Sequence, residues 1–187
     1  MIRDVKMKKR LCPCGSKKQF EECCYTPISG ETAENLKRDI YDIVKLTFRG
    51  QPRGELCLYV SLVVKYLLSM HDIRSYVVAG SSRWIGYPTF FEYKQQGERR
   101  EFHAWVVTQY GETVDLACDA IEERSDYDTL TGPKLGISPP IACWDKVLTD
   151  RVYTPNDKGV KSFDIDKSGL NVLIDRANKI IENLYLK

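Results

Sequence analysis

The chain has 187 residues, of which 43% are hydrophobic, 11% aromatic and 29% charged, and its formal net charge is +2. This length predicts one folded domain, and this composition excludes a largely disordered chain. The longest apolar run, from Leu56 to Val64, is far shorter than the roughly 20 residues that a membrane-spanning helix needs. No apolar stretch follows the basic N-terminus, so we expect no secretory signal and a cytoplasmic protein.

Positive charge is concentrated at the N-terminus. Residues 1–24 carry seven Lys or Arg against three acidic residues, a net charge of +4, and the remaining residues sum to −2. A basic head of this kind favours an acidic partner, such as a ribosome or an acidic protein surface, although a Lys-rich terminus that only confers solubility has the same composition. The sequence shows no base-reading motif, which argues against sequence-specific nucleic-acid recognition.

Four of the seven cysteines form two short pairs separated by eight residues: Cys12, Cys14, Cys23 and Cys24. In a cytoplasmic protein, cysteines favour metal binding or catalysis over disulfides. Four thiolates in two pairs suit the tetrahedral coordination of structural Zn²⁺, and the bound metal would supply the folding energy of a segment too short for a core. A redox dithiol and chance clustering are the alternatives.

The segment CPCGSKKQFEECC resembles the SEC-C zinc motif, which is named for the C-terminus of the SecA translocation motor. All four ligand positions match, and the second glycine of the usual motif is missing. The resemblance implies a structural module with one zinc ion over residues 1–27. In that family the module docks on protein or ribosomal partners and has no catalytic chemistry.

After a break at residues 27–30, the rest of the chain predicts an α+β domain over residues 31–187. Apolar spacing predicts an amphipathic helix from Glu31 to Phe48 and a helix buried on most faces from Leu56 to Ser69. Residues 122–140 are polar and turn-rich, and a last helix is expected near Ser168 to Leu186. The β-rich runs, which predict an antiparallel sheet, are residues 74–79, 89–93, 101–108 and 113–117.

Three residues of the predicted domain suggest nucleophilic chemistry. Cys57 begins the buried helix, where free N–H groups and the helix dipole stabilise a thiolate. His103 lies within a predicted strand, and Asp115 lies in the next one. A helix-borne cysteine that faces a histidine oriented by an acid forms a thiolate–imidazolium pair for acyl transfer. The non-catalytic alternative is a core thiol beside a hydrogen-bonded strand histidine.

The stretches GELCLYVSLVVKYLLSMHDIRSYVVAG and HAWVVTQYGETVDLA resemble the transglutaminase-like branch of the papain-like cysteine enzymes. The resemblance covers about residues 50–120 and implies a papain-like core in which a nucleophile helix packs on an antiparallel sheet. It implies Cys57 as the nucleophile, His103 as the general base and Asp115 as the orienting acid. The spacing from Arg53 to Cys57 is also similar to the nucleophile motif of the arylamine N-acetyltransferases, which share this core.

Other positions extend or depart from the family pattern. Gln51 precedes Cys57 by six residues, an offset that papain-like proteases use for an oxyanion-hole amide. Trp84 is a candidate wall of a substrate groove and equally a candidate surface anchor. Thr113 stands where the family often has an aromatic residue, and the Pro-Thr that often follows the Val-Asp is absent.

The loop between the histidine strand and the aspartate strand decides whether the triad can form. Side chains alternate between the two faces of a strand. A two-residue turn at 110–111 would point Asp115 away from the histidine. A three-residue loop or a bulge would instead pair Val107 with Asp115 on the face of His103, and would place Asp119 opposite His103 as a backup acid.

The sequence therefore favours a cysteine-dependent hydrolase or acyl transferase, of the protease or amidase kind, that acts on a peptide or side-chain amide through an acyl-enzyme. Hydrolysis is favoured over crosslinking because the sequence shows no dedicated amine site. The zinc module would bring the enzyme to a protein or ribosomal partner. The alternative is a non-catalytic adaptor that uses a papain-like domain as a binding platform for a protein or a ribosome.

Overall fold

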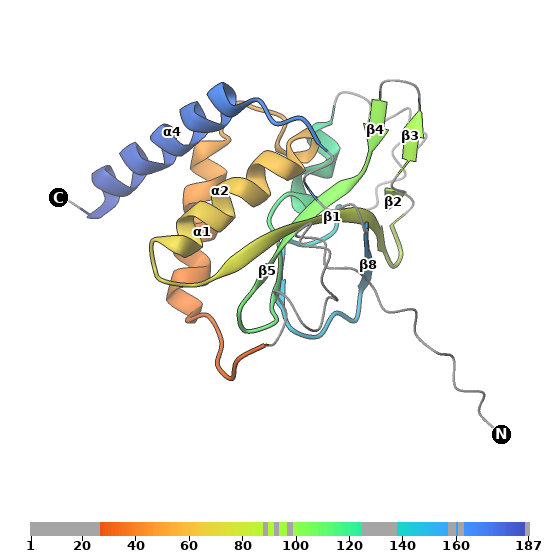
Figure 1. The fold of residues 1–187 in the computed structure, drawn as a ribbon, viewed down its shortest axis with the longest axis horizontal. Helices are drawn as coiled ribbons and strands as arrows, with labels where there is room; N and C mark the ends of the chain where they lie inside the picture. Colours follow the sequence, from red (N-terminus) through yellow and green to blue (C-terminus); the bar gives the residue numbers. More distant parts are fainter. Residues whose placement is uncertain are drawn as a thin grey trace.

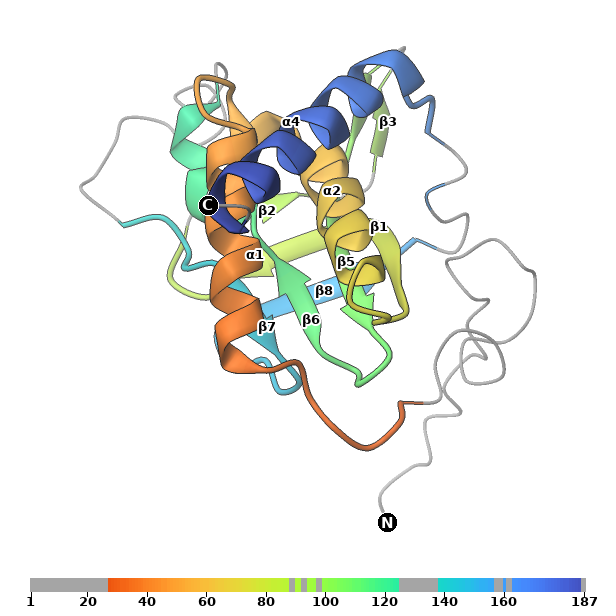
Figure 2. The ribbon, with the colours of Figure 1, turned by 90° about the vertical axis from the view of Figure 1, so that its left-hand side faces the viewer.

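The computed structural model describes residues 27–87, 90–91, 94–96, 99–124, 138–156, 160 and 163–185. The predicted zinc ligands lie outside these ranges. The described residues form an α+β fold, as the sequence predicts. Its α-helices are α1 (Glu34–Thr47), α2 (Cys57–Ser69) and α4 (Lys167–Tyr185), and two short 3-10 helices are η2 (Arg53–Glu55) and η3 (Cys118–Glu123). The α-helices pack together over one face of an antiparallel sheet (Figures 1 and 2).

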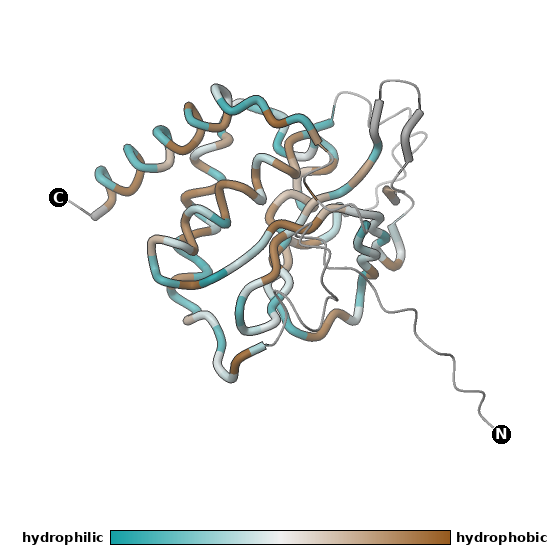
Figure 3. The backbone as a smooth tube through the Cα atoms, viewed as in Figure 1, coloured by the Kyte–Doolittle hydropathy of each residue, from teal (hydrophilic) through white to brown (hydrophobic). Residues whose placement is uncertain are grey.

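The helices follow the apolar pattern of the sequence. Figure 3 shows α2 as mostly hydrophobic and α4 as alternating between hydrophobic and hydrophilic residues. Helix α1 buries Ile40, Ile43 and Val44. It begins at Glu34 and not at the predicted Glu31, because the preceding Thr32 is held by hydrogen bonds to a buried carboxylate. No helix among the described residues combines the length and the apolar character that a membrane crossing requires.

The main sheet has the strand order β2-β1-β5-β6-β7, and β8 pairs with β1 off this path. A separate hairpin is formed by β3 (Lys94–Gln96) and β4 (Arg99–Glu101). Every strand pair is antiparallel. The strands of the main sheet are β1 (Ser75–Trp84), β2 (Phe90–Phe91), β5 (His103–Thr108), β6 (Thr113–Asp115), β7 (Cys143–Asp145) and β8 (Arg151–Pro155).

Strand β1 is longer than the predicted run of residues 74–79, because it has successive partners. Residues 75–80 pair with β5, and residues 80–84 pair with β8. Gly80 belongs to both ladders, opposite His103 and Pro155. A Cβ atom at this position would clash with the Thr154 carbonyl oxygen, so glycine allows β8 to approach. Strand β8 was not predicted from the sequence.

The two faces of the sheet have separate cores. Val77, Ala79, Ala104 and Val106 pack with the helices in the main core. The alternate side chains of the same strands form a second cluster on the other face, which Tyr153 covers: Tyr76, Val78, Trp105 and Val107. His103 belongs to this second face by strand alternation, and it stands at the end of β5 that lies beside the start of α2.

Glu112 joins the segment before α1 to the hairpin between β5 and β6. Its carboxylate is buried (1% exposed) and accepts hydrogen bonds from the Thr32 backbone N–H (2.9 Å), the Thr32 hydroxyl (2.7 Å) and the Thr108 hydroxyl (2.8 Å). Burial alone would raise the pKa of Glu112, but these donors lower it below its ordinary value. The charged form of Glu112 therefore stabilises the folded chain.

We expect Glu112→Gln to lower the free energy of unfolding by about 1–3 kcal/mol near neutral pH, because an amide replaces a buried charged acceptor. The carboxylate contribution is present above the ordinary glutamate pKa and is lost as the pH falls through the lower value of the folded chain. The difference between the variant and the unmodified chain should therefore shrink at about pH 3. Urea unfolding at the two pH values measures it.

The control is Glu34→Gln, which removes an 85% exposed carboxylate paired with Lys37. This change should leave stability within about 0.5 kcal/mol. Equal effects of the two substitutions would contradict the role assigned to Glu112.

Candidate active site

Cys57 is the first residue of α2, and its side chain lies beside the start of β5. The N-cap residue Leu56 has no side chain that caps α2, and the positive end of the helix dipole lies beside the thiol. The Sγ atom lies 4.0 Å from the carbonyl oxygen of Phe102, the residue before β5. Cys57 is 6% exposed, so its thiol is almost completely shielded from solvent.

His103 contacts both of the other residues that the sequence singled out. Its Nε2 atom lies 2.7 Å from Oδ2 of Asp115, and the two side chains are almost completely buried. The Cys57 side chain lies near enough to the same ring to raise the pKa of His103. Because Nε2 is used by Asp115, Nδ1 is the ring nitrogen that remains for the thiol. The structure thus brings Cys57, His103 and Asp115 together in one chain of contacts.

Mutual attraction favours the charged forms of His103 and Asp115, although both side chains are buried. Burial alone would lower the pKa of His103, but the Asp115 carboxylate and Cys57 raise it to about 10. Burial alone would raise the pKa of Asp115, but His103 and further hydrogen-bond donors lower it to about 2. The pair is therefore an imidazolium and a carboxylate around neutral pH.

The hairpin between β5 and β6 sets the position of the acid. The Thr108 backbone N–H donates to the Glu112 carbonyl oxygen (3.0 Å), which leaves a three-residue loop, 109–111, in which Gly111 adopts a left-handed conformation with φ of 78°. Val107 pairs with Thr113, so Asp115 falls on the face of His103, as the three-residue loop predicted. The predicted pairing of Val107 with Asp115 is wrong, because the ladder is displaced by two residues.

Asp119 is not a backup acid for His103. It lies in η3, where its Oδ2 atom accepts hydrogen bonds from the Tyr41 hydroxyl (2.7 Å) and from Arg53 Nη2 (3.1 Å). The predicted position opposite His103 depended on the displaced register, and the chain leaves the sheet at Asp115 before Asp119 could pair. Asp119 instead fastens the loop before the nucleophile.

Arg53 and Gly54 hold this loop, which contains η2, against η3. The buried Arg53 guanidinium donates through Nη1 to the Leu116 carbonyl oxygen (2.9 Å), in addition to its ion pair with Asp119. A Cβ atom on Gly54 would clash with the Ala120 carbonyl oxygen. The segment before Cys57 is thus tied to the segment after Asp115, which fixes the nucleophile relative to the acid.

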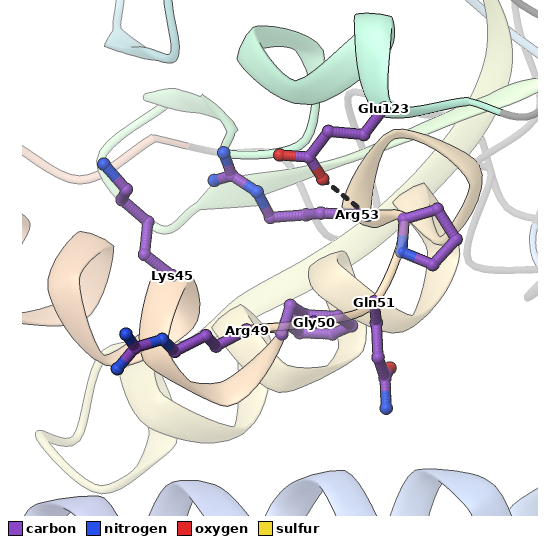
Figure 4. A pocket seen from close by; sticks show the side chains of 8 residues that line it. Lys45, Arg49, Gly50, Gln51, Arg53 and Glu123 are labelled. Carbon is purple, nitrogen blue, oxygen red and sulfur yellow. Dashed lines mark hydrogen bonds between the residues drawn. The ribbon is translucent and has the colours of Figure 1, made fainter.

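Gln51 lies apart from the other candidates. Its side chain is exposed and lines a pocket of about 440 Å³ together with Lys45, Arg49, Arg53 and Glu123. In Figure 4 it points away from Arg53 and Glu123. Among the described residues that line this pocket there is neither Cys57 nor His103. The structure therefore places the exposed Gln51 side chain in this pocket, and its role in an oxyanion hole stays a prediction.

Aromatic rings surround His103 and keep water from the ion pair. Trp84 meets the imidazole edge to face at a centroid distance of 5.3 Å, and Phe91 stacks on it at 5.9 Å. Trp84 is 2% exposed, so the surface-anchor alternative is wrong. Tyr153 stacks at 6.1 Å from the imidazole, and its hydroxyl donates a hydrogen bond to Oδ2 of Asp115 at 2.5 Å.

Tyr153 is the functional candidate that the sequence analysis missed. It lies in β8, 38 residues after Asp115. The only signal for this strand was the short β-prone run Val152-Tyr153-Thr154, which carries no motif.

Cys118 and Cys143 are the other cysteines among the described residues, and neither has a histidine partner there. Cys118 and Cys143 are buried thiols, and burial raises the pKa of both, to about 12 for Cys143. Cys118 accepts a contact from Arg151 Nη1 at 3.5 Å. The described part of the chain contains no group of His, Cys, Asp and Glu side chains suited to a metal ion. The predicted ligands Cys12, Cys14, Cys23 and Cys24 lie outside it.

No protein-family model matches the chain. The fold is similar to a crystal structure of a genomics target whose name states no activity, with a TM-score of 0.54 and 15% sequence identity. The similarity covers 81% of this chain and 80% of that one. At this identity the comparison shows a shared α+β fold and carries no information about function.

We expect Arg53→Ala to lower the free energy of unfolding by about 2 kcal/mol, because the partly buried Asp119 carboxylate and the Leu116 carbonyl lose the donors of a buried guanidinium. Urea unfolding measures this effect. The control is Arg49→Ala, an exposed arginine that lines the same pocket, which should change stability by less than about 0.5 kcal/mol. If the two variants unfold alike, Arg53 does not fasten the nucleophile loop.

Proposed function

We propose that the chain is a cysteine-dependent enzyme that acts on an amide or another acyl bond. The observation that carries this proposal is the contact chain from Cys57 through His103 to Asp115, with its 2.7 Å imidazole–carboxylate hydrogen bond. An acid-oriented histidine beside a thiol at a helix N-terminus is the arrangement that generates a nucleophilic thiolate. We assign Cys57 as the nucleophile, His103 as the general acid and base, and Asp115 as the orienting acid.

The reaction follows from these positions. The Cys57 thiolate attacks the substrate carbonyl carbon, and a C–S bond forms as the His103 imidazolium gives its proton to the leaving amine and the C–N bond breaks. Water, or another acceptor, then attacks the thioester while His103 takes its proton, and the thiolate is released. The backbone N–H groups at the start of α2 are the donors available for the negative charge that develops on the carbonyl oxygen.

Asp115 serves both steps without taking the proton. Its Oδ1 atom accepts the backbone N–H groups of Ala117 and Cys118, each at 3.2 Å, while Oδ2 faces His103. These fixed donors keep the carboxylate ionised, so the imidazole can give a proton in the first step and take one in the second. Loss of this orientation would leave the ring free to turn away from the thiol.

The papain-like, transglutaminase-like core is part of the same proposal. A helix that begins with cysteine and then antiparallel strands that carry histidine and aspartate occur here in the family's order. We assign a peptide or side-chain amide as the substrate class on the sequence resemblance, with hydrolysis favoured over transfer to an amine. The oxyanion role of Gln51 is not part of the proposal, because its exposed side chain lines a pocket to which neither Cys57 nor His103 contributes.

The zinc module completes the proposed function. Four cysteine thiolates are a donor set that suits structural Zn²⁺, and the spacing of Cys12, Cys14, Cys23 and Cys24 supports one ion in residues 1–27. Bound zinc would fold this segment and take no part in the acyl chemistry. The net charge of +4 on residues 1–24 supports an acidic protein or ribosomal surface as its docking partner.

A non-catalytic adaptor is the second candidate, and the burial of the site favours it. Cys57 is 6% exposed and His103 is 3% exposed, and aromatic rings cover the histidine. A buried Cys-His-Asp network of this kind can specify core packing without reacting with a substrate. Thiol reactivity separates the two candidates, because a core thiol reacts slowly and independently of His103.

We expect iodoacetamide to alkylate Cys57 readily at about pH 6, and His103→Ala to slow this reaction at least ~10-fold by removing the imidazolium. Peptide mass mapping of the zinc-loaded chain identifies the labelled cysteine. The control is His71→Ala, which removes the other histidine, at the exposed end of α2. Slow labelling that ignores both substitutions would exclude the enzyme and leave the adaptor.

We expect one zinc ion per chain, and Cys12→Ser should lower this content because a tetrahedral site loses a ligand. Elemental analysis of the purified chain measures the metal directly. Cys143→Ser is the control, since Cys143 is a buried thiol of the sheet and not a predicted ligand. Equal zinc content in both variants would contradict the assigned ligands.

A further inference from the structure

We propose that Tyr153 is a positioning residue of the site: its hydroxyl holds the Asp115 carboxylate in place for His103. The inference rests on the proposed function, since it concerns the same cysteine and histidine. Tyr153 comes from β8, outside the stretch of residues 50–120 that resembles the transglutaminase-like enzymes. It would therefore be a fourth member of the site that the sequence resemblance does not contain.

The hydrogen bonds of Asp115 are the first argument. Its Oδ2 atom accepts from both His103 Nε2 (2.7 Å) and the Tyr153 hydroxyl (2.5 Å). Its Oδ1 atom accepts two backbone N–H groups of the following turn. Tyr153 is thus a side-chain donor on the very oxygen that faces the imidazole, so its removal changes the acid at the point of contact.

The direction of this hydrogen bond is fixed by the chemistry of the two groups. Burial and the nearby Asp115 charge raise the pKa of Tyr153, so its hydroxyl stays protonated. Since the carboxylate has no proton to give, the hydroxyl donates and Oδ2 accepts. A donor on Oδ2 makes that oxygen less basic, which keeps the proton of the pair on His103 and not on Asp115.

Packing aligns the imidazole as well. The Tyr153 ring is nearly parallel to the His103 ring, with an interplanar angle of 13° and a centroid distance of 6.1 Å. It is also tilted against Trp105 at 4.7 Å. Tyr153 pairs with Ser82 in the second half of β1, where Gly80 lets the two backbones approach. The ring and the hydroxyl are therefore both presented by one fixed strand.

The alternative is that Tyr153 only fills the cluster on this face of the sheet. A packing role would affect stability and would leave unchanged the pH dependence of thiol reactivity. A positioning role changes how well His103 activates the Cys57 thiol, and alkylation at low pH depends most on that activation. The pH profile of alkylation therefore distinguishes the two roles.

The test is the rate of Cys57 alkylation by iodoacetamide in Tyr153→Phe, between about pH 5 and pH 8. This substitution keeps the ring and removes the hydroxyl. We expect a rate about tenfold lower than in the unmodified chain near pH 6, with the two rates converging at the high end. A profile identical to that of the unmodified chain would overturn the inference.

The matched control is Tyr66→Phe, because its hydroxyl also donates to a side chain, Oδ1 of Asn178 at 2.9 Å, but lies between α2 and α4. It should leave the profile unchanged. An equal slowing in both variants would show a general loss of packing and would also overturn the inference.

His103→Ala separates this inference from the proposed function. If it leaves Cys57 alkylation unchanged, the enzyme proposal fails and Tyr153 has nothing to position. If it slows alkylation and Tyr153→Phe does not, the role of Tyr153 alone is overturned.

Should Tyr153→Phe not fold, 3-fluorotyrosine at position 153 keeps the ring and makes the hydroxyl a stronger donor. It should change the rate of alkylation near pH 6, and an unchanged rate would overturn the inference.

Discussion

The other parts of this site are arranged around the buried contact between the Asp115 carboxylate and the His103 imidazole. Two opposite charges can remain in a protein interior only if each is paired and the remaining polar atoms are satisfied. Here the hairpin turn, the backbone after β6 and β8 each supply a part of that requirement. The aromatic rings around the histidine then exclude water, which strengthens the pair.

Local pattern predicted much of this architecture. The three α-helices of the described residues follow apolar periodicity, because each buries one face or most of its surface in the main core, where α2 lies against the sheet and α1 and α4 pack on the helices. Cys57, His103 and Asp115 were found from residue type and neighbouring residues, and the structure brings them together. The face of Asp115 followed from the alternation of side chains and a three-residue loop. The exact pairing of residues across the hairpin was not predicted, because it depends on where the hairpin closes. A hydrogen bond between the Thr108 and Glu112 side chains lies at that point.

Long-range contacts account for what the sequence did not reveal. The role of Asp119 depends on Tyr41 and Arg53, which lie 78 and 66 residues earlier in the chain. The position of Gln51 depends on the path that the chain takes through η2 to Cys57. The number of residues between Gln51 and Cys57 does not determine that path. Strand β8 is short and half exposed, so its β-prone run shows too little pattern to predict a strand, and its structure depends on pairing with β1.

Strand β1 pairs with β5 up to Gly80 and with β8 from Gly80 onward, and this arrangement limits where the chain can be truncated. A fragment that ended before β8 would retain the cysteine, the histidine and the aspartate. It would nevertheless lose the partner of residues 80–84 and leave one edge of β1 with open backbone groups, which promote pairing with other chains. The smallest piece that preserves the site is therefore larger than the piece that contains its motifs. Domain boundaries drawn from motif matches alone would yield aggregating protein.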